Sequence, residues 1–127
     1  MIKVVAALIE KDDKVLIARR STGDSDLIGY WEFPGGKVEN EEDEIQAIER
    51  EILEEFELKI IAKKFLINNI CEYPTKTIDL RLYKCEYESG DFSLHAHSEY
   101  KWIDKKDILS YKLAPADIPL AEYVRSM

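Results

Sequence analysis

Hydrophobic and polar positions divide the chain into strand-like and helix-like segments. Residues 4–9 and 15–18 are apolar, and the charged residues 11–13 between them predict a turn, so the N-terminal part is expected to form a β-hairpin. Further strands are predicted for residues 30–33, 58–71, 77–87 and 100–103. The segment 21–29 is polar and is predicted as a loop, and the Pro-Gly-Gly sequence at 34–36 is expected to stop the strand before it.

Helical periodicity begins near residue 41. One apolar stripe is predicted on a helix over residues 41–57, formed by Ile45, Ile48, Ile52 and Phe56. Asn40 is predicted as the N-cap of this helix, and the acidic residues after it suit the positive end of the helix dipole. Shorter helical segments are predicted at 107–111 and 116–126. Strands dominate, so the fold class is α+β, with a mixed sheet and helices packed on it.

Composition narrows the picture further. The 127 residues are the size of one domain, predicted to span residues 1–127. The chain has 26 acidic and 18 basic residues, and this net charge of -8 argues against binding to a nucleic-acid polymer. It is compatible with a small polyphosphate held through metal cations. Cys71 and Cys85 are expected to be reduced, and the short apolar start predicts neither a membrane span nor a leader, so a cytoplasmic protein is expected.

Three carboxylates gather on one side of the predicted helix. Because each helical residue advances by about 100°, Glu51, Glu54 and Glu55 lie within one stripe beside the apolar one. Like charges at this spacing repel by a few tenths of a kcal/mol per pair. Mg²⁺, or Mn²⁺ in its place, would relieve that repulsion and share its remaining coordination sites with phosphate oxygens. The alternative interpretation of such a stripe is a solvated acidic face.

The spacing around this stripe is specific. From Gly36, five residues lead to Glu42, and seven more lead to the sequence Arg-Glu-Ile-Leu-Glu-Glu at 50–55. This resembles the Nudix box, in which a glycine, a glutamate and an Arg-Glu-aliphatic-any-Glu-Glu sequence follow at the same intervals. Glu57 departs from the pattern, because the family usually has glycine there. The departure bears on how the helix ends, where a left-handed residue is common.

The resemblance extends over the whole chain. Segments 31–39, 97–102 and 113–120 are similar to those of MutT-like members, and the last is most similar to that of CTP pyrophosphohydrolases. The resemblance implies an α/β/α sandwich and Mg²⁺-dependent hydrolysis of a nucleoside triphosphate to the monophosphate and pyrophosphate. The expected substrates are CTP, dCTP or oxidised nucleotides such as 8-oxo-dGTP, and the expected assembly is a monomer or homodimer. The alternatives are hydrolysis of another nucleoside diphosphate derivative and a non-catalytic nucleotide-binding domain.

The resemblance also implies roles for individual residues. The metal ligands would be the side chains of Glu51, Glu54 and Glu55 together with the Gly36 carbonyl. Arg50 is expected to hold carboxylates in place by bidentate hydrogen bonds. Glu42 is a weaker candidate for such support, with a plain surface position as the alternative.

Substrate contacts are expected from three places. Arg20 or its neighbour Arg19 would bind phosphate, and strand alternation allows only one of them to face inward. Phe33 is the candidate to stack on a base, with Tyr30 and Trp31 as alternatives, although Trp31 is equally expected in the core. Asp117 is predicted to accept a hydrogen bond from the base, and its alternative role is to cap the terminal helix.

Two histidines lie between the predicted strands 77–87 and 100–103. His95 and His97 are expected to be loop residues, because two ligands do not make a zinc site. MutT-like members usually carry a glutamate just before the second histidine, where this chain has Ala96. Either Glu99 or a Nudix-box glutamate, most simply Glu51, is therefore expected to position the attacking water.

Overall fold

The computed structural model describes residues 1–23 and 25–127. Within them one sheet contains the strands β1 (Ile2–Lys11), β2 (Lys14–Arg20), β3 (Trp31–Glu32), β4 (Gly35–Lys37), β5 (Lys59–Tyr73), β6 (Lys76–Ser89) and β7 (His97–Asp104). The α-helices are α1 (Glu44–Phe56) and α2 (Ile118–Arg125), and the 3-10 segments are η1 (Ser25–Leu27), η2 (Lys105–Ser110) and η3 (Pro115–Asp117).

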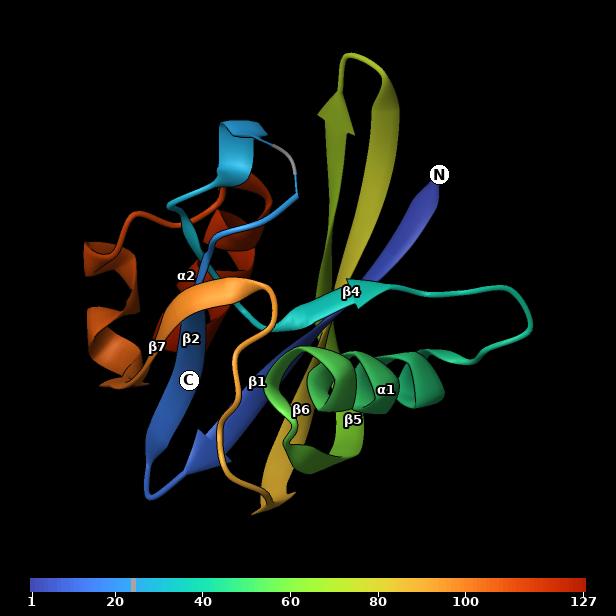
Figure 1. Cartoon of the computed structure of the whole chain (residues 1–127). Helices are drawn as coiled ribbons and strands as arrows, with labels where there is room; N and C mark the ends of the chain where they lie inside the picture. Colours follow the sequence, from blue (N-terminus) through green and yellow to red (C-terminus); the bar gives the residue numbers. More distant parts are fainter. Residues whose placement is uncertain (24) are drawn as a thin grey trace.

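The sheet is mixed, as the sequence predicts. Its main strand order is β3-β2-β1-β6-β5, while β4 pairs with β1 and β7 pairs with β2. Only the β1–β6 pair is parallel among the described strands. The predicted N-terminal hairpin is confirmed, and its turn contains Asp12 and Asp13 with positive φ angles of 51° and 63°. In Figure 1 the β5–β6 hairpin extends well beyond α1.

The two faces of the sheet carry different helices. Strand β1 directs Val5, Ala7 and Ile9 toward one core cluster, which α1 completes with Ala47, Ile48, Ile52 and Phe56. The alternate residues Ala6 and Leu8 enter a second cluster, which α2 completes with Leu120, Ala121 and Val124. Because β1 is buried on both faces, the sheet lies between two helical layers. The predicted α/β/α sandwich is confirmed (Figure 1).

The start of α1 differs from the prediction. The N-cap is Asp43 and not Asn40: its side chain accepts a hydrogen bond from the Gln46 backbone, and the Gln46 side chain accepts one from the Asp43 backbone. This reciprocal capping box satisfies two backbone donors and so fixes the first turn. Ile45 is 42% exposed and does not join the apolar stripe, while Ala47 takes a buried place instead.

Smaller differences concern segment ends. Residues 34–36 do more than stop a strand, because Gly35–Lys37 forms β4 against β1. A side chain on Gly35 would lie 1.9 Å from the Val5 carbonyl oxygen, so this pairing requires glycine there. The predicted turn at 107–111 is η2, and the terminal helix is divided into η3 and α2. The predicted loop 21–29 contains η1, and its Asp24 lies outside the described residues.

Two observations complete the fold. Cys71 and Cys85 are both free thiols, as the sequence predicts. None of the helices formed by residues 1–23 and 25–127 combines the length and apolarity needed to span a bilayer.

Candidate active site

The carboxylate-bearing face of α1 lies directly against the backbone of β4. A side chain on Gly36 would come within 2.3 Å of the Glu51 carboxylate, so any larger residue here would displace the Glu51 side chain from its present place. The pairing of β4 with β1 holds Gly36 opposite Val5. The glycine of the Nudix-box pattern therefore allows β4 and the carboxylate-bearing helix α1 to meet without a side chain between them.

Arg50 lies at the centre of these carboxylates, as its sequence position predicts. Its Nε and Nη2 atoms donate to the two oxygens of Glu42 at 2.7 and 2.9 Å. Its Nη1 atom donates to Glu51 at 2.9 Å and to Glu54 at 3.1 Å, while Nη2 also donates to the Lys37 carbonyl at 3.1 Å. The hydrogen bonds from Arg50 lower the pKa of Glu42. Glu42 is thus paired with Arg50 and only 14% of its side chain is exposed, which favours a supporting role over a plain surface position.

The three box glutamates have different environments. Glu54 is exposed, with 59% of its side chain accessible. Burial raises the pKa of Glu51, despite its bond to Arg50. Burial, followed by the charges of Glu51 and Glu32, raises the pKa of Glu55 to about 8. The Oε2 atom of Glu55 is buried and has no hydrogen-bond partner among the described residues. Because burial and neighbouring negative charge disfavour the ionised form of these carboxylates, a bound cation would stabilise them.

These donors suit a hard divalent cation. All are oxygens, and the buried Oε2 of Glu55 would gain the partner it lacks. Within residues 1–23 and 25–127 no three acidic, histidine or cysteine side chains already converge as a metal-binding group. Arg50 accounts for part of this, because it binds oxygens of both Glu51 and Glu54. The residues therefore fit a metal site by chemistry and require side-chain adjustment to close around the ion.

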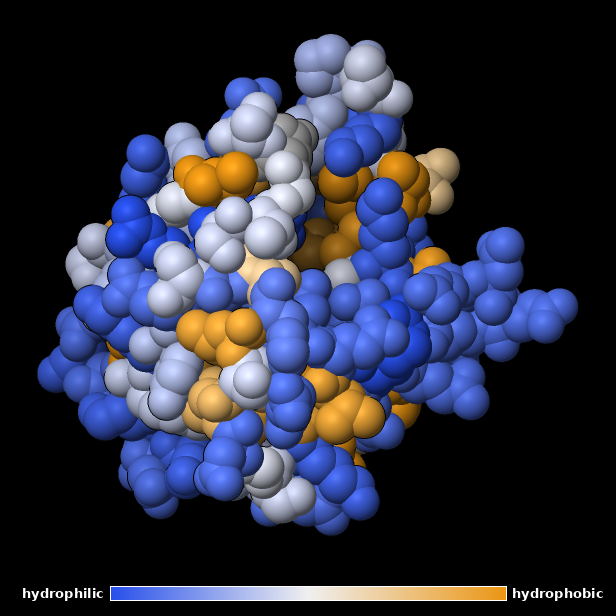
Figure 2. Space-filling view, viewed as in Figure 1, coloured by the Kyte–Doolittle hydropathy of each residue, from blue (hydrophilic) through white to orange (hydrophobic). Residues whose placement is uncertain are grey.

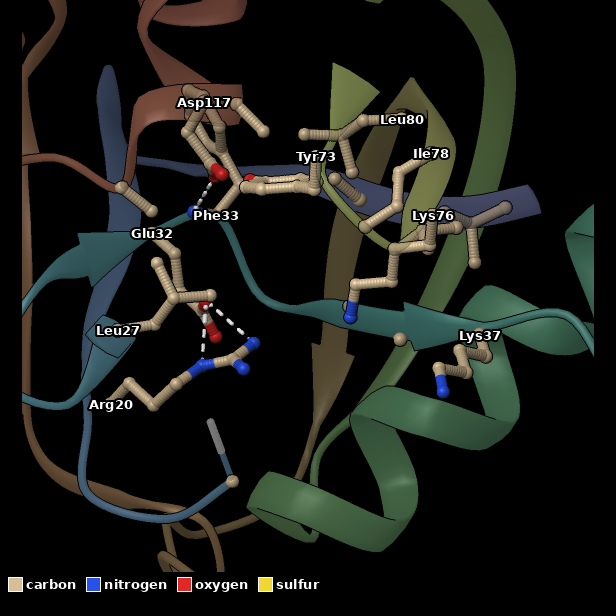
Figure 3. A pocket seen from close by; sticks show the side chains of 18 residues that line it. Arg20, Leu27, Glu32, Phe33, Lys37, Tyr73, Lys76, Ile78, Leu80 and Asp117 are labelled. Atoms are coloured by element: carbon tan, nitrogen blue, oxygen red, sulfur yellow. Dashed lines mark hydrogen bonds and ion pairs between the residues drawn. The ribbon is translucent and has the colours of Figure 1, made fainter. Parts of the chain in front are cut away.

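A cavity of about 350 Å³ lies on the other side of Gly36. Its apolar wall includes Val4, Phe33, Ile78, Leu80, Ala114 and Ala116. Arg20, Lys37 and Lys76 bring positive charge to it from three separate elements, and Asp117 and Glu32 bring carboxylates (Figure 3). Figure 2 shows the apolar residues inside a hollow on this face. The cavity can thus hold an apolar ring and an anionic group side by side.

Arg20 and Arg19 face opposite ways, as strand alternation predicts. Arg20 lines the cavity, and its Nε and Nη2 atoms lie 3.1 and 2.8 Å from Glu32. Arg19 is exposed and donates to Glu99 at 3.1 Å. The structure therefore places Arg20 at the candidate substrate site. It does not bring Glu99 together with the box glutamates, because that side chain is bound to Arg19 at the surface.

Asp117 is buried, with 6% of its surface exposed. Its Oδ2 atom accepts a hydrogen bond from the Phe33 backbone N–H at 2.9 Å. Although it stands at the N-terminus of α2, its side chain makes no capping bond within the described chain, so the alternative role as a helix cap is wrong. Burial, and then the Glu32 charge, raises the pKa of Asp117 to about 8. Phe33 and Trp31 both belong to the core cluster on the α2 face, and of the two Phe33 also lines the cavity.

The prediction that both histidines lie in a loop is half wrong. His97 begins β7 and is buried, and its Nε2 atom lies 2.9 Å from Glu32. His95 is exposed, and its Nε2 atom lies 2.6 Å from Glu57. Their separate partners leave no shared zinc site. Sequence reasoning missed Glu32, although a charged residue between the aromatic Trp31 and Phe33 was a usable signal.

Comparisons with known proteins agree with this geometry. The family model described as "NUDIX domain" matches residues 1–124. The CTP pyrophosphohydrolase of Escherichia coli is 40% identical over 96% of this chain and 90% of its own length. A putative 8-oxo-dGTP diphosphatase 2 of Mycobacterium tuberculosis is 30% identical over 90% of this chain and 81% of its own length.

Solved structures give the same result. The solution structure of the E. coli ORF135 protein superposes with a TM-score of 0.86 at 40% identity, covering 96% of this chain and 86% of that one. The MutT protein of Methanosarcina mazei superposes with a TM-score of 0.87 at 26% identity, covering 98% of this chain and 93% of that one. With its glutamate helix, its glycine contact and a family match over nearly its whole length, the chain belongs to the NUDIX domain family and is a MutT-like Nudix hydrolase.

Proposed function

We propose that this enzyme is a Mg²⁺-dependent pyrophosphohydrolase of nucleoside triphosphates, with cytidine nucleotides as its preferred substrates. The observation that carries the proposal is the position of Gly36. Gly36 leaves no room for a side chain between β4 and the Glu51 carboxylate, and it also lines the cavity that contains Asp117. A nucleotide whose base enters the cavity would therefore extend its phosphates toward the carboxylate helix.

The chain's own residues have distinct tasks in this reaction. Glu51, Glu54, Glu55 and the Gly36 carbonyl would hold Mg²⁺, which supplies charge neutralisation on the phosphates and lowers the pKa of bound water. Arg50 fixes the positions of Glu51 and Glu54. In the reaction, water supplies the oxygen for a new P–O bond, and the anhydride P–O bond between the α- and β-phosphates breaks. Glu51 is the candidate to orient that water, because Glu99 is bound elsewhere.

Arg20 and Asp117 would bind the two ends of the substrate. Arg20 uses Nε and Nη2 on Glu32, which leaves Nη1 for a phosphate oxygen. Asp117 uses Oδ2 on Phe33, which leaves Oδ1 for the base. The ionised form of this carboxyl only accepts hydrogen bonds, so it favours the exocyclic amine of cytosine over the carbonyl that uracil presents there. Because the pKa of Asp117 is about 8, this preference is expected to strengthen as the pH rises through about 8. The proposed substrates are free nucleotides, which the net charge of -8 favours over nucleic-acid polymers.

Oxidised purine nucleotides form the second part of the proposal. Several relatives are named 8-oxo-dGTP diphosphatases, among them those of Proteus vulgaris and Haemophilus influenzae, at 34% and 28% identity. The cavity of about 350 Å³ is large enough for a purine ring as well as a pyrimidine. A role in removing damaged nucleotides from the cytoplasmic pool is consistent with both substrate classes.

A panel of nucleoside triphosphates with Mg²⁺, measured by pyrophosphate release, tests the proposal. CTP, dCTP, UTP, dGTP and 8-oxo-dGTP are compared by kcat/KM for the wild type and Asp117→Ala. The expected wild type hydrolyses CTP or dCTP well above UTP, and the variant loses that selectivity. Equal rates on CTP and UTP in the wild type would contradict base recognition by Asp117. Release of inorganic phosphate without pyrophosphate would contradict the reaction type.

A further inference from the structure

We infer that His97 is a positioning residue that holds Glu32, and through Glu32 holds Arg20, on the wall of the cavity. His97 itself does not line the cavity. The inference rests on the proposed function only for the statement that Arg20 binds substrate. The contacts that join His97, Glu32 and Arg20 do not depend on that function.

The His97 ring is fixed on two sides. Its side chain is 1% exposed, and its ring stacks on Phe56 with the centroids 4.8 Å apart and an interplanar angle of 21°. Phe56 is fully buried and is the last residue of α1, directly after the glutamate stripe. The imidazole therefore bridges the end of the catalytic helix and the Glu32 side chain, which lies in the cavity wall.

The hydrogen-bond pattern assigns the proton on the ring. Nε2 lies 2.9 Å from the Glu32 Oε2 atom, whereas Nδ1 is buried and has no partner in the described part of the chain. A carboxylate oxygen accepts, so Nε2 carries the hydrogen and donates it. With the proton on Nε2, the buried Nδ1 holds only a lone pair, so no buried N–H of the ring lacks an acceptor. We therefore assign the tautomer with the proton on Nε2.

Glu32 receives donors on both of its oxygens. Arg20 donates to Oε1 from Nε and Nη2, and His97 donates to Oε2. Figure 3 shows the contacts between Arg20 and Glu32. With Oε2 held by His97, the carboxylate plane is fixed, and Oε1 has one orientation toward Arg20. Arg20 is only partly buried, with 31% of its side chain exposed, so without this anchor the guanidinium would lose its fixed direction.

Two variants separate this role from simple packing. His97→Gln keeps an N–H at the place of Nε2 but loses the stacked ring, and His97→Phe keeps the ring but loses the donor. If His97 positions Glu32, His97→Phe raises KM for CTP by about tenfold with a smaller change in kcat, and His97→Gln stays within about threefold of the wild type. If His97 only packs on Phe56, the order of the two variants reverses. His95→Gln, at the exposed histidine, is the matched control.

A second measurement does not depend on activity. In ¹⁵N NMR spectra of the whole protein, His97 is expected to show a protonated Nε2 and an unprotonated Nδ1. The Arg20 Nε–H is expected to be protected from exchange in the wild type and His97→Gln, and unprotected in His97→Phe. The opposite tautomer, or protection that survives in His97→Phe, would overturn the inference. If the wild type hydrolyses no nucleotide, the proposed function fails, and these spectra still decide the role of His97.

Discussion

Arg50 and Glu42 form a two-point ion pair between the helix α1 and the segment that precedes it. The two contacts measure 2.7 and 2.9 Å, from Nε to Oε2 and from Nη2 to Oε1. The remaining donor, Nη1, is shared by Glu51 and Glu54. One guanidinium thus joins three carboxylates, and its planar geometry is what permits this.

Arg50→Lys tests that dependence on planar geometry. A lysine keeps the charge but offers one nitrogen, so it cannot serve Glu42 and Glu51 together. We expect the metal-free protein to lose roughly 2 kcal/mol of unfolding free energy, because charge-assisted hydrogen bonds are broken. Denaturant titration in EDTA measures this loss. Lys14→Arg, at an exposed ion pair with Asp104, is the control and should change stability little.

Glu54→Gln tests the metal site. Glu54 is exposed and contacts Arg50, so its replacement should leave the fold intact and lower kcat by roughly 10²-fold at saturating Mg²⁺. Removal of one repelling charge should also leave thermal stability without metal unchanged or slightly higher. Glu122→Gln, at an exposed position on α2, is the matched control. Near-full activity of Glu54→Gln would remove this glutamate from the metal ligands.

Glu99→Gln tests which residue positions the attacking water. The carboxylate of Glu99 pairs with Arg19 at the surface, with 43% of its side chain exposed. We expect kcat to fall by less than about threefold, because a surface ion pair contributes little. Glu51→Gln in the same assay should fall by roughly 10²-fold or more, as expected for a general base or metal ligand. A large loss of kcat in Glu99→Gln would mean that Glu99 does position the attacking water.

The shared face of the glutamates follows from helical spacing, whereas local signals misplaced the start of that helix. One helix carries Arg50, Glu51, Glu54 and Glu55, and its geometry fixes which carboxylates share a face. The Asn40 prediction failed because Asp43 forms the complete capping box with Gln46. Glu57 replaces the usual glycine and still ends α1, with a left-handed φ of 56° and a side chain bound to His95.

Other features depend on contacts between distant segments. The role of His97 requires Phe56, Glu32 and the β2–β7 pairing, which lie far apart in the sequence. Alternation within one strand shows that the side chains of Arg19 and Arg20 point to opposite faces of the sheet, but it does not show which one faces the cavity. The pairing of β2 with β3 settles this, because Glu32 lies opposite Ala18 and so on the same face of the sheet as Arg20, which it binds.

Asp117 should make the stability of the protein depend on pH. Burial raises its pKa from 3.8 to about 8, so the folded protein keeps this carboxyl protonated where the unfolded chain is ionised. The folded state then binds more protons, and this contribution to stability is complete below pH 3.8 and is lost as pH rises through about 8. For one group, each pH unit in that window is worth at most about 1.4 kcal/mol.

Asp117→Asn removes this titration and keeps an oxygen that accepts from the Phe33 backbone. Thermal unfolding in EDTA at about pH 6 and pH 9 compares the two proteins across the upper part of the window. We expect the Tm of the wild type to fall by up to roughly 10 °C more than that of Asp117→Asn, with Asp107→Asn, at an exposed position, behaving like the wild type. Glu51 and Glu55 titrate in both proteins, so the difference between them isolates Asp117. Equal falls in Tm for the wild type and Asp117→Asn would mean that this carboxyl is already ionised when buried.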